Sequence, residues 1–600
     1  MCGFIGHLSK NIINHSKLEI ANERIVCRGP DSCKKINFQH NQVNFSLFFN
    51  RLRILDLSEA ADQPMWSEGN RSVLMFNGEI YNHKSVREKL SLNGIKFSTK
   101  KSDTETILKG LDFYGEDFIK QLRGQFAIFY YNFHKNEVIL SRDRLGQKPL
   151  YYKLSNEKLT FSSNLKSLLD FEGNSFLRKE SLIDYIKYGS IPSPNTLFKN
   201  VYKVRPAETL KIMLGTDRFS IKKSNYWDVK DYLDYQEFNK EEFFEIFSES
   251  VKVRQVADVE IANFLSGGID SSSIVKNMFD NGSKINSFSV NVDNSKYDES
   301  KWSRLVSEKY DTNHIEVDVN SKTDFEYYTL PLKSLDEPYS DPSLIPSFYL
   351  SKEISKYYKV AISGDGGDEL LGGYKRVNKT FKNVGKFSNL VSRLYYFYPS
   401  ILGTGNYFLS KNKDIDIRYK SFLEDINFLN LLGLDDLSSE ENLLFLDKNI
   451  DSYKSILITE YKFFLSDMML FKVDRTSMYH SVEVRSPFLD HELLEYIFSH
   501  SVEYVDINQP KKILKDYLIS DFDINFVSRS KQGFVFDIEN WIYKNYENIF
   551  SILENGKVST VLDIYKLKYL QLNKSRINAQ RIWKVFVLNY YLDDISFNFE

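Results

Sequence analysis

The second half of the chain alternates between short apolar runs and longer amphipathic stretches. Four apolar runs have the length of a strand, at 259–265, 284–292, 313–319 and 358–362. Between two of them, residues 297–310 have the spacing of a helix. Because buried strands that alternate with helices are typical of a parallel sheet, an α/β domain is predicted here, with ligands at the C-terminal ends of its strands.

The first part of the chain has a different pattern, with many short alternating runs and few helices. Strands are predicted at 50–56, 71–76, 124–130 and 137–143. One helix is predicted to end near Tyr114. This pattern indicates a sheet-rich, layered α+β domain.

The length of 600 residues is too great for a single core, so two or more domains are expected. We expect a first domain over 1–205, a linker over 206–238 and a second domain over 239–600, because 206–238 is polar and charged without clear periodicity. The stretch 376–455 is rich in Tyr, Phe, Leu and Lys. We interpret it as helical core and helical additions to the second domain, with no chemistry assigned.

Composition narrows the class of protein. A net charge of −2 does not point to nucleic acid as a partner. The three cysteines, Cys2, Cys27 and Cys33, are too sparse for a disulfide framework and suit a reducing cytosol, so a cytoplasmic location is expected. No signal peptide is expected, and no membrane span, because the most apolar stretch, 390–409, is interrupted by Arg, Pro, Gly and Asn.

The turn after the first apolar run of the second domain is rich in glycine and hydroxyl groups, over Ser266-Gly267-Gly268-Ile269-Asp270-Ser271. Glycines let the backbone approach a ligand, and the amides that open the following helix favour an anion. Asp270 would repel a phosphate unless a cation such as Mg²⁺ lies between them. An ordinary glycine turn with a helix cap would explain part of this string but not all of it.

A second turn of the same kind follows the fourth apolar run, over Ser363-Gly364-Asp365-Gly366-Gly367-Asp368. It could be an ordinary loop. Its position after a buried strand favours a ligand site instead, because two strand-to-helix turns that end in aspartate are what a nucleotide with Mg²⁺ requires.

Cys2 follows the initiator methionine directly. If Met1 is removed, one residue carries both a thiol nucleophile and an α-amine that can accept its proton. Without other motifs, a cysteine near a terminus would be interpreted as a small apolar residue. The motifs further along the chain decide between this interpretation and a catalytic nucleophile.

Four motifs resemble those of the class II, or N-terminal-nucleophile, glutamine amidotransferases. They are Cys-Gly-Phe-Ile-Gly at 2–6, Arg-Gly-Pro-Asp at 28–31, Asn-Gly-Glu-Ile-Tyr-Asn at 77–82, and Arg-Asp-x-x-Gly-x-Lys-Pro-Leu-Tyr-Tyr at 142–152. The resemblance implies an αββα sandwich that hydrolyses glutamine to glutamate and ammonia.

The same resemblance implies a role for each site residue. Cys2 attacks the side-chain amide, and Asn77 with the backbone amide of Gly78 forms the oxyanion hole. By the same resemblance, Arg51 binds the α-carboxylate of glutamine, and Glu79 and Asp103 bind its α-ammonium group. Taken singly, each has a structural alternative, such as a surface arginine, a hairpin turn or a helix cap.

The Ser-Gly-Gly string resembles the SGGxDS loop of the ATP pyrophosphatases, which cleave ATP between its α and β phosphates. The resemblance assigns Asp270 and Asp368 to Mg²⁺-pyrophosphate. It assigns contacts with ATP to Leu265, Ser266, Gly267, Gly268, Ser271, Val290, Ser363 and Gly364. Residues 528–534 resemble the family's lysine loop, so Lys531 is the candidate to stabilise charge on the α-phosphate, with a surface lysine as the alternative.

Nearly the whole chain is similar, in domain order, to the glutamine-hydrolysing asparagine synthetase family, including later motifs at 472–475 and 482–491. The resemblance implies a ligase that uses glutamine, ATP, Mg²⁺ and a carboxylate acceptor, passes ammonia between its domains, and forms a homodimer. Family members carry Ser-Gly-Glu-Gly where this chain has Asp365, so the acceptor stays open. Aspartate is expected, a uronic acid of surface-polysaccharide synthesis is the first alternative, and a non-catalytic binding relative is the second.

Overall fold

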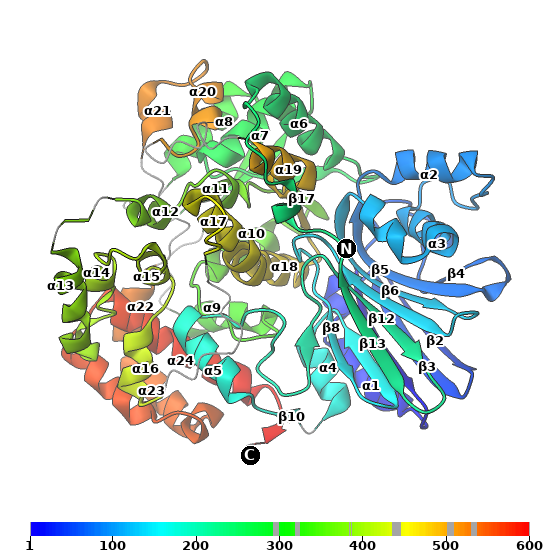
Figure 1. Ribbon diagram of the computed structural model, residues 1–600, viewed down its shortest axis with the longest axis horizontal. Helices are drawn as coiled ribbons and strands as arrows, with labels where there is room; N and C mark the ends of the chain where they lie inside the picture. Colours follow the sequence, from blue (N-terminus) through cyan, green and yellow to red (C-terminus); the bar gives the residue numbers. More distant parts are fainter. Residues whose placement is uncertain are drawn as a thin grey trace.

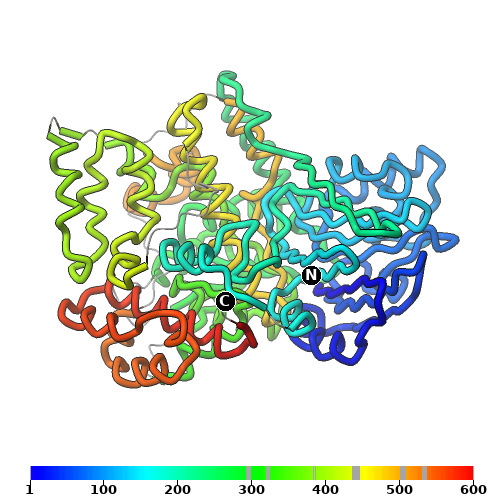
Figure 2. The backbone as a smooth tube through the Cα atoms, turned by 60° about the horizontal axis from the view of Figure 1, so that its bottom comes forward, coloured from blue at the N-terminus to red at the C-terminus, as the bar shows by residue number. Residues whose placement is uncertain are grey.

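The fold comes from a computed structural model, which describes residues 2–598 apart from 174, 292–298, 319–323, 383, 386, 435–445, 501–508 and 530–536. The first domain lies at one end of the molecule, and a group of helices lies at the other (Figure 1). The parallel sheet of the second domain lies between them. Figure 2 shows the same order from a second direction, with the helices of residues 388–432 far from the N-terminal strands.

Two six-stranded antiparallel sheets form the first domain. In spatial order the first contains β11 (Tyr202–Lys203), β8 (Tyr151–Leu154), β9 (Lys158–Ser162), β1 (Gly3–Ser9), β3 (Val43–Arg51) and β2 (Ser32–His40). The second contains β13 (Phe219–Asn225), β12 (Glu208–Leu214), β7 (Glu137–Arg142), β6 (Gly124–Asn132), β5 (Ser72–Ile80) and β4 (Met65–Trp66).

The two sheets pack face to face through aromatic side chains. Phe129 of one sheet stacks on Phe161 of the other at 4.5 Å between ring centroids. Helices α1 (His15–Glu23) and α4 (Leu165–Glu172) lie on the first sheet, and α2 (His83–Leu92) and α3 (Asp103–Tyr114) lie on the second (Figure 1). The four layers confirm the predicted αββα sandwich.

The sheet extends into the segment that we expected to be a linker. Strands β12 and β13 lie within 206–238, and β12 pairs with β7 from Thr209 opposite Ser141 to Met213 opposite Glu137. Because hydrogen bonds along this edge tie the segment to the first domain, we propose that the boundary between the domains lies after Asn225.

Helix α5 (Lys179–Tyr188) also differs from the expected division. It precedes residue 205, yet Tyr185 Oη donates to the carbonyl of Lys584 at 2.8 Å. The backbone amide of Asp425 donates to the carbonyl of Lys187 at 3.2 Å. The helix therefore packs on the helical additions of the second domain (Figure 1).

The predicted parallel sheet of the second domain is confirmed, and it has five strands, one more than the four apolar runs indicated. Its strands in spatial order are β16 (Asn313–Asp318), β15 (Asn286–Asn291), β14 (Ile261–Phe264), β17 (Val360–Ile362) and β18 (Glu483–Arg485). Helix α7 (Ile269–Asp280) follows β14, α8 (Ser300–Lys309) follows β15, and α10 (Leu344–Ile354) lies between β16 and β17 in the chain. Because β14 and β17 are neighbours, the two Gly-rich turns that follow them meet at one edge of the sheet.

The helical additions include α24 (Arg576–Asp593), whose Trp583 and Phe586 are buried with residues of several other helices. Among the described residues, no helix combines the length and the apolar character needed to cross a membrane.

Two candidate active sites on either side of a domain interface

The first candidate site lies at the start of β1, in the sandwich. Cys2 is buried, and its backbone nitrogen donates to Oδ1 of Asn77 on β5 at 2.9 Å. Asn77 Nδ2 is also buried and has no hydrogen-bond partner among the described residues. A buried amide donor beside a thiol is suited to bind an oxyanion. Burial raises the pKa of the Cys2 thiol, while Arg51 and the Leu52 amide oppose that shift.

Gly78 follows Asn77 and has a backbone that only glycine adopts readily. Its φ is +154°, and a Cβ at this position would lie 1.9 Å from the carbonyl oxygen of Gln125 on β6. The close approach of β5 to β6 therefore depends on the missing side chain, as the predicted role of the Gly78 amide requires.

Glu79 and Asp103 lie next to this turn and are both buried. Asp103 opens α3, and its Oδ2 accepts from the backbone amide of Ile80 at 3.2 Å. Burial raises the pKa of Asp103 to about 6. Burial also raises the pKa of Glu79, and the nearby Arg485 opposes that shift. A pair of buried carboxylates is suited to receive an ammonium group.

Arg51 ends β3 and is buried, with partners already in place. Its guanidinium donates to Asp62 Oδ1 at 2.5 Å and to the carbonyl of Ser58 at 2.8 Å. These bonds hold the loop after β3 against the strand. Its predicted contact with the α-carboxylate of glutamine stays a prediction.

The second candidate site begins at the end of β14. Gly267 has φ +69°, and a Cβ there would lie 2.5 Å from the backbone carbon of Trp302. Ser266 Oγ accepts from the Gly268 amide at 3.2 Å, which shapes the turn. Leu265 is buried, and its backbone amide donates to the carbonyl oxygen of Phe288 on β15 at 2.7 Å. The turn is therefore rigid and leads directly into α7.

The turn after β17 packs against this loop. A Cβ on Gly364 would lie 3.0 Å from the Cβ of Asp270, so the two turns are in contact. Ser363 Oγ donates to Asp365 Oδ2 at 2.7 Å, and Val290 lies near the end of neighbouring β15. The residues that the sequence assigned to ATP thus lie around one edge of the sheet.

Lys511, which no sequence motif assigned to the site, lies between the two predicted Mg²⁺ ligands. Its ammonium group is 2.5 Å from Asp270 Oδ2 and 2.5 Å from Asp368 Oδ1. The two carboxylates therefore converge on one cation. Lys511 precedes α20 (Lys512–Leu518), but no local pattern marks it as different from the adjacent Lys512. Among the described residues, no group of three or more His, Cys, Asp or Glu side chains is arranged to hold a metal ion.

Arg529 is a second residue that the sequence analysis did not assign. Its Nη2 donates to the carbonyl of Gly267 at 2.5 Å, and its guanidinium lies 4.8 Å from the centre of the Trp302 ring. It therefore supports the Ser-Gly-Gly turn from outside the sheet. Lys531, the candidate of the same segment, lies outside the described residues.

A cavity of about 300 Å³, including its open part, lies between the two candidate sites. Gln125, beside Gly78, lines it from the first domain, and Ser363 and Asp365 line it from the second. Lys148 also lines it and is buried, which lowers the pKa of its ammonium group to about 8. The cavity thus borders residues of the second site and a neighbour of the first site.

Paired charges hold the domains together beside this cavity. Arg28 donates to both carboxylate oxygens of Asp474 at 2.8 and 2.9 Å. Burial alone would raise the pKa of Asp474, but Arg28 and Arg475 lower it to about 2.

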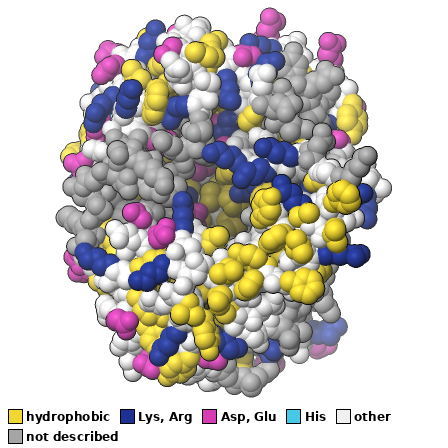
Figure 3. Space-filling model, turned by 90° about the vertical axis from the view of Figure 1, so that its left-hand side faces the viewer, with side chains coloured by type: hydrophobic (Ala, Val, Ile, Leu, Met, Phe, Trp, Pro, Cys, Tyr) yellow, Lys and Arg dark blue, Asp and Glu magenta, His cyan; other side chains and the backbone are white. Residues whose placement is uncertain are grey.

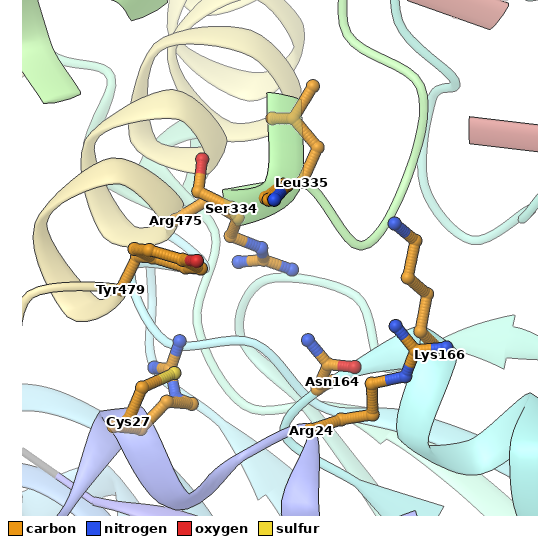
Figure 4. A pocket seen from close by; sticks show the side chains of 10 residues that line it. Arg24, Cys27, Asn164, Lys166, Ser334, Leu335, Arg475 and Tyr479 are labelled. Atoms are coloured by element: carbon orange, nitrogen blue, oxygen red, sulfur yellow. The ribbon is translucent and has the colours of Figure 1, made fainter. Parts of the chain in front are cut away.

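A second interface cavity has a volume of about 460 Å³ including its open part. Arg24 and Lys166 lie on one wall of it, and Arg475 and Tyr479 lie on the other (Figure 4).

Comparison with known proteins agrees with this division into two sites. A family model described as "Glutamine amidotransferase domain" matches residues 1–227, and one described as "Asparagine synthase" matches residues 242–589. The class defined here is a glutamine amidotransferase domain joined to a nucleotide-binding synthetase domain. The chain belongs to the asparagine synthase family.

Relatives in this family match over most of their length. Asparagine synthetase (glutamine-hydrolyzing) 1 of Bacillus subtilis is 29% identical over 98% of this chain and 96% of its own. Asparagine synthetase (glutamine-hydrolyzing) 3 of the same organism is 26% identical over 89% of this chain and 87% of its own. Among solved structures, glutamine phosphoribosylpyrophosphate amidotransferase of B. subtilis covers 44% of this chain and 60% of its own at 14% identity, with a TM-score of 0.28.

Proposed function

We propose that the chain is a ligase that hydrolyses glutamine and uses the ammonia to amidate a carboxylate, which ATP first activates as its acyl-adenylate. AMP and pyrophosphate are the other products. The observation that carries the proposal is the cavity whose walls include Gln125, beside the Cys2 site, and Asp365, beside the Ser-Gly-Gly turn. A cavity that reaches from one site to a neighbour of the other suits two reactions that share an intermediate.

In the first reaction, the Cys2 thiolate attacks the side-chain amide of glutamine. The Asn77 Nδ2 group and the Gly78 amide stabilise the negative charge on the tetrahedral intermediate. Glu79 and Asp103 hold the α-ammonium group, and Arg51 holds the α-carboxylate. Removal of Met1, which this mechanism requires, would give the thiol its own α-amine as the base.

In the second reaction, the turns after β14 and β17 hold the phosphates of ATP and the acceptor carboxylate. Lys511 stabilises negative charge where the α-phosphate is attacked, alongside Lys531, whose expected role there stays a prediction. Asp270 and Asp368 fit Mg²⁺, because two converging carboxylates leave positions for phosphate oxygens. A bound Mg²⁺ ion would neutralise charge on the departing pyrophosphate.

We propose aspartate as the acceptor, and therefore asparagine as the product. The alternative acceptor is a uronic acid. It is favoured by Asp365, whose carboxylate is one methylene shorter than the glutamate of the family motif and accepts from Ser363 at 2.7 Å. A shorter carboxylate leaves more room for an acceptor larger than aspartate.

An acceptor screen with the full chain tests the proposal. The chain is incubated with ATP, Mg²⁺ and glutamine, with aspartate or with glucuronic and galacturonic acids, and pyrophosphate and AMP are measured together. We expect stoichiometric AMP and pyrophosphate with aspartate. Product formation with a sugar acid alone would replace aspartate by the alternative acceptor. Absence of both glutaminase activity and pyrophosphate with every acceptor would favour a non-catalytic relative.

The Cys2→Ala variant is the control that separates the two reactions. It is expected to lose glutamine-dependent amidation while amidation with added ammonium salts continues, because added ammonia reaches the second site without the first reaction.

A homodimer is also part of the proposal. Sedimentation velocity of the full chain would measure its oligomeric state.

A further inference from the structure

One helix among the additions exposes a row of large apolar side chains. Helix α13 (Ser388–Arg393) continues into a short 3₁₀ helix, η7 (Leu394–Phe397). Four large apolar side chains repeat along it at spacings of three, four and three residues, and their exposed fractions are 77% for Phe387, 64% for Leu390, 49% for Leu394 and 83% for Phe397. Ser388 and Ser392 on the other side are buried. A helix that packs on a protein core usually has the opposite arrangement.

The apolar surface continues onto neighbouring elements. Leu402 is exposed, and Asn573 Nδ2 donates to its carbonyl at 3.3 Å, which brings the exposed Leu572 close to it. Tyr396 and Tyr407 are also exposed, on η7 and on α14 (Asn406–Leu409), which packs against α13. We call this surface the aromatic face: Phe387, Leu390, Leu394, Tyr396, Phe397, Leu402, Tyr407 and Leu572.

The segment that carries most of the aromatic face is rich in basic residues. Residues 375–413 contain eight Lys or Arg and no Asp or Glu, in a chain whose net charge is −2. Arg376 is paired with Glu460. Five others are exposed on described residues, at Lys375, Lys379, Lys382, Arg393 and Lys413. Figure 3 shows hydrophobic side chains gathered on this side of the molecule below a row of Lys and Arg.

We propose that the aromatic face binds the surface of a membrane that contains anionic phospholipids. Exposed Phe, Tyr and Leu side chains insert at the boundary between headgroups and acyl chains, and surrounding lysines attract anionic headgroups. The helices are too short to span a bilayer, so the chain lies on the surface. A nucleic acid would also attract the lysines, but it would leave the leucines in water. The proposal does not depend on the proposed function.

The test is flotation of the full chain with two kinds of vesicle, phosphatidylcholine alone and phosphatidylcholine with phosphatidylglycerol. We expect binding to the anionic vesicles that weakens as salt is raised. The Leu390→Ser/Phe397→Ser variant is expected to bind at least about tenfold more weakly, because both side chains lose their apolar contact with lipid. The Lys379→Glu/Arg393→Glu variant is expected to lose a similar amount of vesicle affinity, because the new carboxylates repel the anionic headgroups.

A matched control is Leu92→Ser, which removes an 89% exposed leucine at the end of α2, on the opposite side of the molecule (Figure 1). It is expected to bind vesicles within about twofold of the parent chain. Circular dichroism and the thermal unfolding temperature of each variant confirm that it is folded. Absence of vesicle binding by the parent chain would overturn the proposal, as would equal binding by the Leu390→Ser/Phe397→Ser variant. If that variant instead lost only self-association in sedimentation velocity, the aromatic face would be an interface between copies.

Discussion

Arg485 of the parallel sheet and Glu79 of the first candidate site form an ion pair across the domain interface, with Nη2 and Oε2 3.1 Å apart. Both side chains are buried. Arg485 ends β18, which pairs with β17, and the turn after β17 contains Asp365. Strand β18 thus contacts both candidate sites, through the Arg485 side chain on one side and its pairing with β17 on the other.

The Arg485→Met variant is expected to be markedly less stable than the parent chain. It leaves Glu79 and Glu483 buried without their shared cation, which costs about 3–5 kcal/mol for a buried ion pair that loses one partner. Thermal unfolding followed by calorimetry measures the change as a lower unfolding temperature.

The exposed pair Arg304–Glu316 provides the control for that measurement, since the side chain of Arg304 is 52% exposed. Arg304→Met is expected to change the free energy of unfolding by less than about 1 kcal/mol. Equal unfolding temperatures for Arg485→Met and the parent chain would contradict the role given to Arg485.

The Gly78→Ala variant is expected to lose glutaminase activity and keep ammonia-dependent amidation. A methyl group at this position would lie 1.9 Å from the Gln125 carbonyl oxygen, so β5 must move away from β6 and the Gly78 amide with it. Loss of one oxyanion donor lowers kcat about 100- to 1,000-fold, measured as glutamate released from glutamine.

Gly385→Ala is the matched substitution, because an added Cβ there meets no atom within 4 Å. It should leave both activities unchanged. A Gly78→Ala enzyme with parental glutaminase kcat would show that this amide does not contact the developing charge.

The candidate sites depend more on local patterns than the domain boundaries do. The Ser-Gly-Gly turn and the Asn77-Gly78 pair were predictable because each depends on a few adjacent residues. The segment of β12 and β13 was read as a linker because its strand pairing depends on β7, some 70 residues earlier, as in Thr209 opposite Ser141.

Residues whose function depends on distant partners were missed for the same reason. Lys511 is one of many lysines in the chain, and only the fold brings it to Asp270, 241 positions away. Arg485 was noted within a motif, but its partner Glu79 is 406 positions away. No periodicity or spacing encodes such contacts, since they arise when two domains pack together.

Glutamine use is expected to depend on pH through Asp103, whose pKa burial raises from 3.8 to about 6. The carboxylate is ionised above pH 6 and can bind an ammonium group, whereas below pH 6 it is protonated and neutral. The value of kcat/KM for glutamine should therefore fall about tenfold per pH unit below 6.

The Asp103→Asn variant tests the assignment of that pH dependence. It should have a low kcat/KM for glutamine that no longer changes near pH 6. A parent profile that is flat between pH 5 and 7, or an unchanged inflection in the variant, would show that another group is responsible.

Lys511 is expected to act in the second reaction only. Lys511→Met should lower pyrophosphate release by about 100-fold or more with either glutamine or ammonium as the nitrogen source, because a preorganised cation at the reacting phosphate is lost. Glutaminase activity measured without ATP should stay near the parental value, since Lys511 pairs with Asp270 and Asp368 and not with the Cys2 site. The neighbouring Lys512→Met variant is the control and should retain pyrophosphate release. If Lys511→Met released pyrophosphate normally, the ammonium group would only neutralise the two aspartates in the absence of a metal ion, and the stabilising role would return to another residue of the second site.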